Sequence, residues 1–320
     1  MVKPIILLFG MPRSGTTWLG KIFDSHPSTL YRHEPDSWRP IEEIPLVADI
    51  ADIEHYKEFI RHYCADLTNI RAAKVSVKLP LFKKTYYSSS QYALRWLSIM
   101  GSKIAAKIIG EVNVPDFIEK QKLAKVNVVW KSIESVGRLG VIVRSLADCR
   151  AVLIIRHPCG YAASMLRGQA QNKFEGFSSD YNMLNILLQT KQAQNRGWTL
   201  DEIKDMDPIQ RMMVPWVLLN EKAMDDMQGL EDCMVFKYED LCNDPHGMAR
   251  KLFDFSGLEW SNQVEQFVGQ SISKNQKTYY SVYKDPVVSA TKWREELTGD
   301  KIKIIEEIVA RSKPGSLYYP

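Results

Sequence analysis

A glycine-containing loop near the start of the chain carries the residue types best suited to chemistry. An apolar stretch over residues 4–9 runs into Gly-Met-Pro-Arg-Ser-Gly-Thr-Thr at residues 10–17. Such a loop binds phosphate, because backbone N–H groups at the helix start point at the anion and glycine permits close approach. The glycine spacing is that of a P-loop, but Thr16 replaces the usual lysine and Arg13 lies inside the loop. We therefore expect a 5′-phosphorylated nucleotide, held without the lysine that reaches a γ-phosphate.

A second candidate phosphate ligand follows the strand-like run at residues 151–156. Arg156 ends this run, Pro158 turns the chain, and Ser164 lies eight residues beyond the arginine in an expected helix. An arginine at a strand end can bind a phosphate through two hydrogen bonds. Ligands of open parallel sheets bind beyond the carboxyl ends of the strands, so we expect Arg13 and Arg156 to share one crevice. The alternative is an arginine in a structural salt bridge.

The elements that must position these turns predict an α/β fold. Strand-like runs are expected at residues 4–9, 74–79, 126–130, 151–156 and 233–238. Long helical patterns lie between them, for example at 91–109 and 212–227. Strands alternating with helices predict a P-loop-like, three-layer fold with a central, mostly parallel sheet flanked by helices. We expect a single domain over residues 1–320, with helical insertions at about 36–73 and 167–211 around the substrate site.

Composition limits the possible functions. The chain is 45% hydrophobic and 25% charged, as in soluble globular proteins, and its net charge of +4 is too small to indicate a nucleic acid partner. No apolar run approaches the roughly 18 residues of a membrane span, so we expect a cytoplasmic protein without stable membrane insertion. A chain from which an N-terminal anchor had been removed would have the same pattern. Five cysteines without a C-x-x-C motif predict reduced thiols, and six scattered histidines predict no metal site.

Three segments resemble sulfotransferases, which use 3′-phosphoadenosine 5′-phosphosulfate (PAPS). Residues 12–17, Pro-Arg-Ser-Gly-Thr-Thr, resemble the 5′-phosphosulfate-binding loop of that family. Arg156 with Ser164 resembles the motif that binds the 3′-phosphate. Tyr-Glu-Asp-Leu at residues 238–241, with Asp-Pro at 244–245, resembles a segment of carbohydrate and tyrosylprotein sulfotransferases. The resemblance covers almost the whole chain and implies sulfuryl transfer from PAPS to a hydroxyl acceptor without a metal.

The resemblance also implies roles for individual residues. The implied cofactor-binding residues are Arg13, Ser14, Gly15, Thr16, Thr17, Arg156, Ser164, Tyr238 and Lys284. In the tyrosylprotein branch a serine and a lysine eleven residues later approach the cofactor, which corresponds to Ser273 and Lys284 here. Lys131 matches a family lysine that approaches the sulfate. Arg13 or Lys131 would stabilise the charge that develops on the leaving phosphate oxygen.

The general base is expected close to the first loop. An alcohol has a pKa far above 7, so a base must take its proton as the new bond forms. The catalytic glutamate of the tyrosylprotein branch lies twenty-one residues after the loop arginine, which corresponds to Glu34 here. His33 is the local rival, and a capping or salt-bridging role is the alternative for Glu34. Cytosolic small-molecule sulfotransferases instead use a histidine in a segment that resembles residues 77–80, where this chain has none.

These observations predict a sulfotransferase with Glu34 as general base and in-line transfer to an alcohol on a sugar, lipid or natural product. The carbohydrate and tyrosylprotein branch is the most similar. One alternative is a P-loop kinase that uses ATP and Mg²⁺, against which Thr16 argues. The other is a nucleotide-binding module without catalysis.

Overall fold

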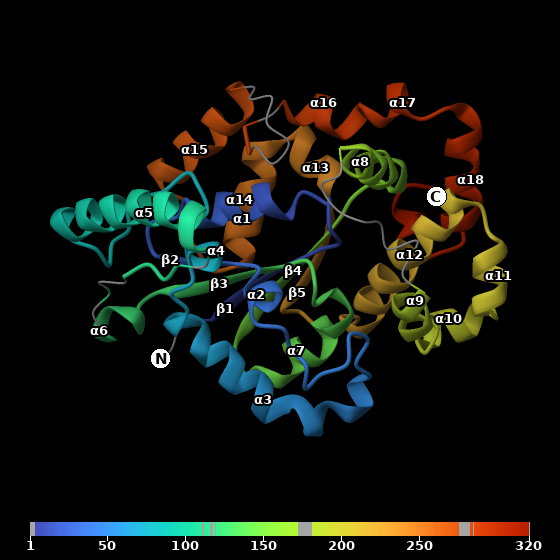
Figure 1. The fold of residues 1–320 in the computed structure, drawn as a ribbon, viewed down its shortest axis with the longest axis horizontal. Coiled ribbons are helices and arrows are strands. Elements are labelled where there is room, and N and C mark those ends of the chain that lie inside the picture. The colour runs from blue at the N-terminus through green and yellow to red at the C-terminus, as the bar shows by residue number, and fades with distance from the viewer. Residues whose placement is uncertain are drawn as a thin grey trace.

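The computed structural model of this protein describes residues 4–110, 112–115, 118, 120–171, 181–274, 282–283 and 285–319, and side chains at 103–109 and 120 lie outside the description. The described residues form an α/β fold in three layers, with helices on both sides of one sheet (Figure 1). The predicted fold class is confirmed. Within the described residues, none of the helices combines the length and the apolar character needed to cross a bilayer.

A parallel sheet forms the middle layer. Its strands in the described part of the chain are β1 (Ile5–Phe9), β2 (Thr29–His33), β3 (Asn127–Ser132), β4 (Cys149–Ile155) and β5 (Cys233–Lys237). They lie in the order β2-β3-β1-β4-β5, and each neighbouring pair is parallel. In the central strand, Leu7 and Phe9 contribute to one core cluster and Ile6 and Leu8 to another. β1 is therefore buried on both faces, which explains its continuous apolar sequence.

Helices cover both faces of this sheet. The α-helices are α1 (Thr16–Asp24), α2 (Pro35–Trp38), α3 (Ile53–Asp66), α4 (Ala73–Ser76), α5 (Ser89–Ile109), α6 (Lys120–Leu123), α7 (Leu139–Ser145), α8 (Pro158–Ala170), α9 (Tyr181–Leu187), α10 (Lys191–Arg196), α11 (Leu200–Asp205), α12 (Pro208–Asp226), α13 (Tyr238–Asn243), α14 (Pro245–Phe255), α15 (Asn262–Ser273), α16 (Pro286–Thr291), α17 (Trp293–Glu296) and α18 (Gly299–Val309). Short 3-10 helices span Ile50–Asp52, Leu67–Asn69, Val136–Arg138 and Gly315–Leu317. The two long helical patterns of the sequence correspond to α5 and α12.

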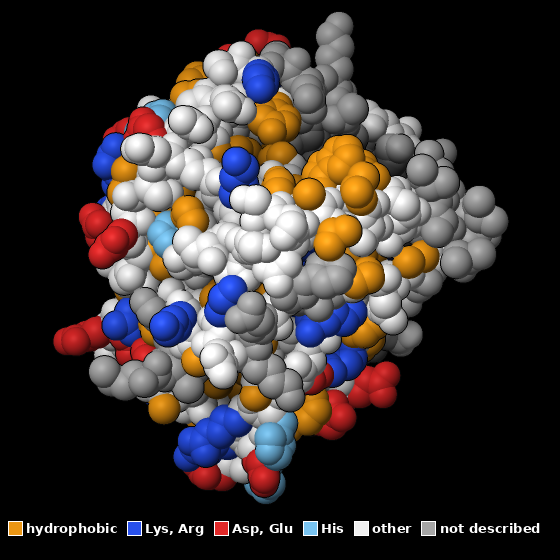
Figure 2. Space-filling model, turned by 90° about the vertical axis from the view of Figure 1, so that its left-hand side faces the viewer, with side chains coloured by type: hydrophobic (Ala, Val, Ile, Leu, Met, Phe, Trp, Pro, Cys, Tyr) orange, Lys and Arg blue, Asp and Glu red, His pale blue; other side chains and the backbone are white. Residues whose placement is uncertain are grey.

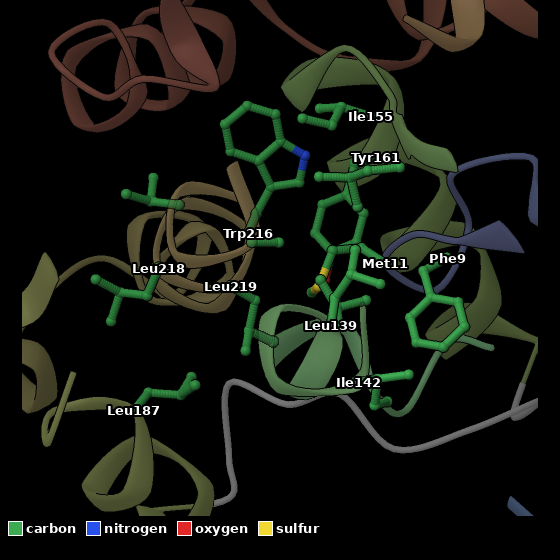
Figure 3. Close-up of a cluster of buried hydrophobic side chains, with 14 of the residues drawn as sticks. Phe9, Met11, Leu139, Ile142, Ile155, Tyr161, Leu187, Trp216, Leu218 and Leu219 are labelled. Atoms are coloured by element: carbon green, nitrogen blue, oxygen red, sulfur yellow. The ribbon is translucent and has the colours of Figure 1, made fainter. Parts of the chain in front are cut away.

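The larger hydrophobic core lies between the sheet and the layer that contains α7, α8 and α12. Trp216 of α12, Tyr161 of α8 and Leu139 of α7 converge there with Phe9 (Figure 3). The opposite core packs α1, α14 and α15 against the other face of the sheet. With both faces covered, the sheet exposes its strand ends as the place for a ligand site.

One predicted strand is wrong. Residues 74–79 contain the short helix α4 instead, although their valines alternate as in a strand. Val75 packs in the larger core, while Val77 packs with Ile99 of α5 in a small separate cluster. The alternation therefore reflects contacts with two different neighbours rather than the two faces of a sheet.

The edge strand β2 was not predicted from the sequence. Its segment contains Arg32 and His33, which weaken the apolar pattern, yet all five of its residues are buried. The guanidinium of Arg32 donates hydrogen bonds to the carbonyl oxygens of Leu67 (2.7 Å) and Thr68 (3.2 Å). These distant carbonyl groups satisfy the buried charge and allow the strand to form.

The stretches predicted as insertions hold helices that belong to the larger core. Residues 36–73 include α3, which contributes Ile60, and residues 167–211 include α9 and α11, which contribute Leu184 and Ile203. Their location around a substrate site stays a prediction. All five cysteines are free thiols, as the sequence predicted.

Candidate active site

The candidate active site lies at the carboxyl ends of the parallel strands. Arg13 follows β1, Glu34 follows β2, and Arg156 follows β4. Lys131 lies near the end of β3, and Tyr238 begins the helix after β5. Residues that are far apart in the sequence thus meet at one edge, where open α/β sheets bind their ligands.

The glycine loop has the backbone of an anion-binding turn. Arg13 and Gly15 adopt left-handed conformations with φ of 70° and 90°, and the N–H of Ser14 donates to the carbonyl of Met11 at 3.1 Å. α1 begins at Thr16, which is buried, and Thr17 beside it is half-buried. The loop therefore places the unsatisfied N–H groups at the start of α1 near the carboxyl ends of the strands.

Ser14 gives a second sign of an anion site. Its side chain is 1% exposed, and its hydroxyl has no hydrogen-bond partner in the described part of the chain. A buried hydroxyl without a partner is costly, because it has lost its hydrogen bonds to water. A phosphate oxygen at the start of α1 would supply the missing acceptor.

Gly15 is required by a close contact. A Cβ atom at this position would lie 2.3 and 2.5 Å from two ring carbons of Tyr238. The same ring lies under the guanidinium of Arg156, whose central carbon is 4.9 Å from the ring centroid. Tyr238 therefore supports both the loop and the second arginine with its ring, through packing and a cation–π contact.

The two arginine-bearing turns are in direct contact. Nη1 of Arg156 donates to the carbonyl oxygen of Arg13 at 2.9 Å, and Nε of Arg13 donates to the hydroxyl of Ser164 at 3.0 Å. Nη2 of Arg156 donates to the carbonyl oxygen of Ser289 at 2.7 Å. Its terminal nitrogens thus bond carbonyl groups rather than a carboxylate, which disfavours the structural salt bridge. Nε of Arg156 is buried without a partner in the described residues, so the guanidinium retains a donor for a ligand.

Residues from the C-terminal region contact the end of β4, although they were not predicted as site residues. The hydroxyl of Tyr318 lies 3.0 Å from the carbonyl oxygen of Ile155 and 3.0 Å from the carboxylate of Glu239. That carboxylate also accepts from the N–H of His157 at 3.1 Å, and burial raises its pKa. The ring of His157 stacks on Trp293 with 4.6 Å between centroids. These contacts hold the turn that carries the second arginine, and of these residues only Glu239 belongs to a segment singled out in the sequence, at 238–241.

Glu34 and Lys131 form an ion pair between the ends of β2 and β3. The Nζ of Lys131 donates to Oε1 of Glu34, and the N–H of Glu34 donates to the carbonyl oxygen of Lys131 at 2.8 Å. The side chain of Lys131 is 1% exposed, whereas that of Glu34 is 24% exposed. Burial lowers the pKa of Lys131, and the carboxylate of Glu34 opposes this shift. The carboxylate is therefore the accessible member of the pair.

His33 lies beside this pair. Its Nδ1 is 2.8 Å from the hydroxyl of Tyr31, and its Nε2 is 3.8 Å from Oε2 of Glu34. Burial, with the positive charges of Lys131 and Lys78, lowers the pKa of His33 well below 6.5. Its imidazole is therefore neutral at neutral pH, and both base candidates of the sequence analysis lie at the same place.

Asp36 anchors the turn that carries the base candidates. Its carboxylate accepts hydrogen bonds from the hydroxyls of Ser132 and Ser135 and from Nε1 of Trp130. These donors belong to β3 and the turn after it, so α2 is held against the strand that contains Lys131. Burial raises the pKa of Asp36, and the two serine hydroxyls oppose the shift. No sequence motif indicates this contact.

The structure gives little support for a role of Ser273 or Lys284 in the site. Ser273 is exposed at the end of α15, and its hydroxyl bonds the carbonyl oxygen of Gln270 in its own helix. The buried Ser271 instead accepts a 3.0 Å hydrogen bond from Nε1 of Trp18 in α1, which ties α15 to the helix after the loop. Lys284 lies outside the described residues. The catalytic role of Ser273 and the cofactor-binding role of Lys284 stay predictions.

Comparison with known proteins identifies the family. A model of the sulfotransferase family matches residues 4–262. Carbohydrate sulfotransferase 2 of mouse and of human is 35% identical over 77 residues, which are 23% of this chain but span only 14% of the length of those relatives. The chain therefore belongs to the sulfotransferase family, whose members are enzymes that transfer sulfuryl groups.

Two of the similar solved structures illustrate a likeness at low sequence identity. The sulfotransferase domain from the curacin biosynthetic pathway is 14% identical with a TM-score of 0.46, covering 96% of this chain and 98% of that chain. A mouse sulfotransferase complexed with 3′,5′-adenosine bisphosphate (PAP) is 12% identical with a TM-score of 0.41. The match covers 98% of this chain and 87% of that chain.

Proposed function

We propose that this enzyme transfers the sulfuryl group of PAPS to a hydroxyl acceptor, with Glu34 as general base. One observation carries the proposal: the Arg13 and Arg156 turns touch each other beside the start of α1. A nucleoside phosphorylated at both its 5′ and 3′ positions needs two anion sites close together. The hydroxyl of Ser14 and Nε of Arg156, both buried without a partner in the described residues, supply donors that fit this ligand.

The cofactor would use the donors of the two turns. Residues 14–17 would hold its 5′ end, through backbone N–H groups and hydroxyls at the start of α1. Arg156 and Ser164 would bind the 3′-phosphate. Because Arg13 donates to Ser164, its guanidinium would lie beside both proposed phosphate sites. PAPS supplies the activated sulfuryl group when it is bound.

In the proposed reaction, the residues of the protein stabilise charge and remove one proton. The acceptor hydroxyl would lose its proton as its oxygen attacks, and the half-buried carboxylate of Glu34 would take that proton. The buried ammonium of Lys131 holds that carboxylate in position and would add positive charge that stabilises the leaving phosphate. A sugar, lipid or natural-product alcohol is the preferred acceptor class.

A ligand comparison tests the donor. We expect 3′,5′-adenosine bisphosphate (PAP) to raise the melting temperature by about 5 °C at a hundredfold excess over its Kd. ATP with Mg²⁺ should have a smaller effect, because Thr16 replaces the P-loop lysine. Incubation with PAPS and panels of alcohols should then yield products heavier by one SO₃ group. Stabilisation by ATP with Mg²⁺ alone would support a kinase, and PAP binding without turnover on any panel would support a non-catalytic module.

Substitution of Gly15 should damage the cofactor site through Tyr238. In Gly15→Ala, the new methyl group collides with the tyrosine ring, and the residue must also hold a φ of 90°. We expect PAP binding to weaken by about tenfold or more, since the collision must displace the ring that packs on the loop and on Arg156. Calorimetric titration with PAP measures the effect.

A second glycine separates the collision from the backbone strain. Gly257 also has a positive φ of 66°, but a Cβ there would meet nothing within 4 Å. Gly257→Ala should therefore lose some thermal stability and keep its PAP affinity. Equal PAP affinity in both variants would contradict the supporting role of Tyr238.

A further inference from the structure

Helix α5 presents an apolar side to solvent. Leu94, Trp96 and Leu97 are 53%, 46% and 61% exposed, and Leu79 in the segment before the helix is 46% exposed. We call these four residues the α5 surface. A helix at the surface of a globular protein normally turns its apolar stripe toward the core. On α5, large apolar groups lie on the outside of the helix as well as on its buried side.

Arg95 and Ile99 tie α5 to the protein body. Arg95 is half-buried, with its guanidinium 5.3 Å from the ring centroid of Tyr87 and one nitrogen donating to the carbonyl oxygen of Pro115 at 3.3 Å. Ile99 is buried and packs on Val77, which lies two residues before Leu79. The orientation of α5 is thus fixed by specific contacts, and the outward apolar side is part of the fold.

We propose that the α5 surface docks on an anionic lipid bilayer, with the helix lying in the plane of the interface. The sequence of the helix favours this partner: residues 89–109 contain three basic residues, of which Arg95 is half-buried, and neither Asp nor Glu. A basic helix with exposed leucines and a tryptophan has the composition of an interfacial segment, which combines buried apolar area with attraction to acidic lipids. Two copies of this chain meeting through α5 would instead bring like charges together.

The position of α5 agrees with this partner. The helix lies at the outer edge of the molecule (Figure 1), and a view onto that side shows hydrophobic side chains gathered in one region (Figure 2). None of the described helices fulfils the requirements for a membrane span, so contact would be with the bilayer surface. Because only α5 and the segment beneath it take part, the rest of the enzyme stays in water.

The docked surface adjoins the base candidates. Lys78 precedes Leu79, and its charge contributes to the lowered pKa values of both Lys131 and His33. Its carbonyl oxygen accepts a 2.8 Å hydrogen bond from Lys21 of α1, which fixes this segment to the helix after the glycine loop. Under the proposed function, an enzyme docked through α5 would therefore present its acceptor side near the lipid surface.

Vesicle binding tests the proposal on the full chain. The protein is sedimented with vesicles of phosphatidylcholine and phosphatidylglycerol in equal parts, and with vesicles of phosphatidylcholine alone. We expect binding to the mixed vesicles, weaker binding to the neutral ones, and release by salt. The double variant Leu94→Ser/Leu97→Ser should bind the mixed vesicles about a hundredfold more weakly, since it removes two large apolar groups from the contact.

A matched pair of substitutions controls for general apolar exposure. Val287 and Val288 on α16 are 52% and 53% exposed, similar to Leu94, but they lie outside the α5 surface. Val287→Ser/Val288→Ser should bind mixed vesicles like the unmodified chain. Both double variants change exposed side chains, so their melting temperatures should stay close to that of the parent.

Three results would overturn the proposal: no binding of the unmodified chain to mixed vesicles, equal loss in both double variants, or a concentration-dependent dimer that disappears only in Leu94→Ser/Leu97→Ser. The last result would show that a second copy covers α5. PAP-induced stabilisation is measured on the same samples. PAP binding without vesicle binding rejects docking alone, and vesicle binding without PAP binding rejects the proposed donor alone.

Discussion

Glu34→Gln should reduce turnover by about 10²–10⁴-fold, the usual contribution of a positioned general base. The amide cannot accept the proton of the acceptor hydroxyl, but it can still accept a hydrogen bond from Lys131. PAP affinity should change by no more than about twofold, because the proposed phosphate donors lie on the Arg13 and Arg156 turns. Single-turnover rates with saturating PAPS, together with PAP titrations, measure the two effects separately.

The pH dependence of this variant distinguishes loss of the base from a change at Lys131. Glu34 supports the charged form of Lys131 against burial, so its removal lowers the pKa of that lysine further. If turnover fell because Lys131 had become neutral, the rate would recover as the pH is lowered and the ammonium re-forms. If the base is lost, the rate should instead rise with pH, as more of the acceptor alcohol ionises.

Two other residues complete the test of the base. Glu134, which follows the same strand as Lys131, carries a second carboxylate in this region. Glu134→Gln should keep the parent rate. A full rate in Glu34→Gln combined with a collapse in His33→Gln would assign proton removal to His33. Its lowered pKa keeps the imidazole neutral below pH 6.5, so an enzyme using it should remain active there.

Local sequence signals were enough for the glycine loop and its flanking elements. An apolar strand, two spaced glycines and a helix start lie within fifteen residues, at 4–18, and each follows from short-range preferences. Arg156 was likewise marked by the buried strand before it and by Pro158 after it. Both turns were predicted to share a crevice, and the structure joins them through a hydrogen bond.

The features that were not predicted depend on contacts between residues that are far apart in the sequence. β2 escaped prediction because the carbonyl groups that satisfy Arg32 lie more than thirty residues away, at Leu67 and Thr68. The contact between Glu34 and Lys131 spans 97 residues and follows from the register that pairs His33 with Lys131. Such pairings depend on the assembled sheet, and no short motif encodes them.

The residues that contact the Arg156 turn are also far from it in the sequence. Tyr318 and Trp293 reach the end of β4 from the C-terminal part of the chain, at sequence separations above one hundred residues. Nothing in their immediate sequence indicates a function. Their contact with the turn means that the proposed 3′-phosphate site depends on the docking of the C-terminal region as well as on Arg156 itself.

Arg156→Ala should weaken PAP binding by about 1.5–3 kcal/mol, or about 10- to 150-fold, because it removes a charged hydrogen-bond donor from the proposed 3′-phosphate site. The substitution also removes the bonds to the carbonyl oxygens of Arg13 and Ser289, so the melting temperature of the free enzyme should fall. PAP lacks the sulfuryl group, so its affinity reports on the phosphate sites without the reaction. Calorimetric titration with PAP and with adenosine 5′-phosphate measures the effect.

The second nucleotide makes the test specific to the 3′-phosphate. Adenosine 5′-phosphate lacks that group, so its affinity should change much less than that of PAP in Arg156→Ala. Arg156→Lys keeps the charge but not the bidentate donor geometry. Its PAP affinity should lie between that of the parent and that of the alanine variant. Arg150→Ala changes an arginine near the other end of β4, paired with Asp232, and should leave PAP affinity unaltered. Equal losses for PAP and adenosine 5′-phosphate in Arg156→Ala would mean that Arg156 supports the loop around Arg13 rather than the 3′-phosphate.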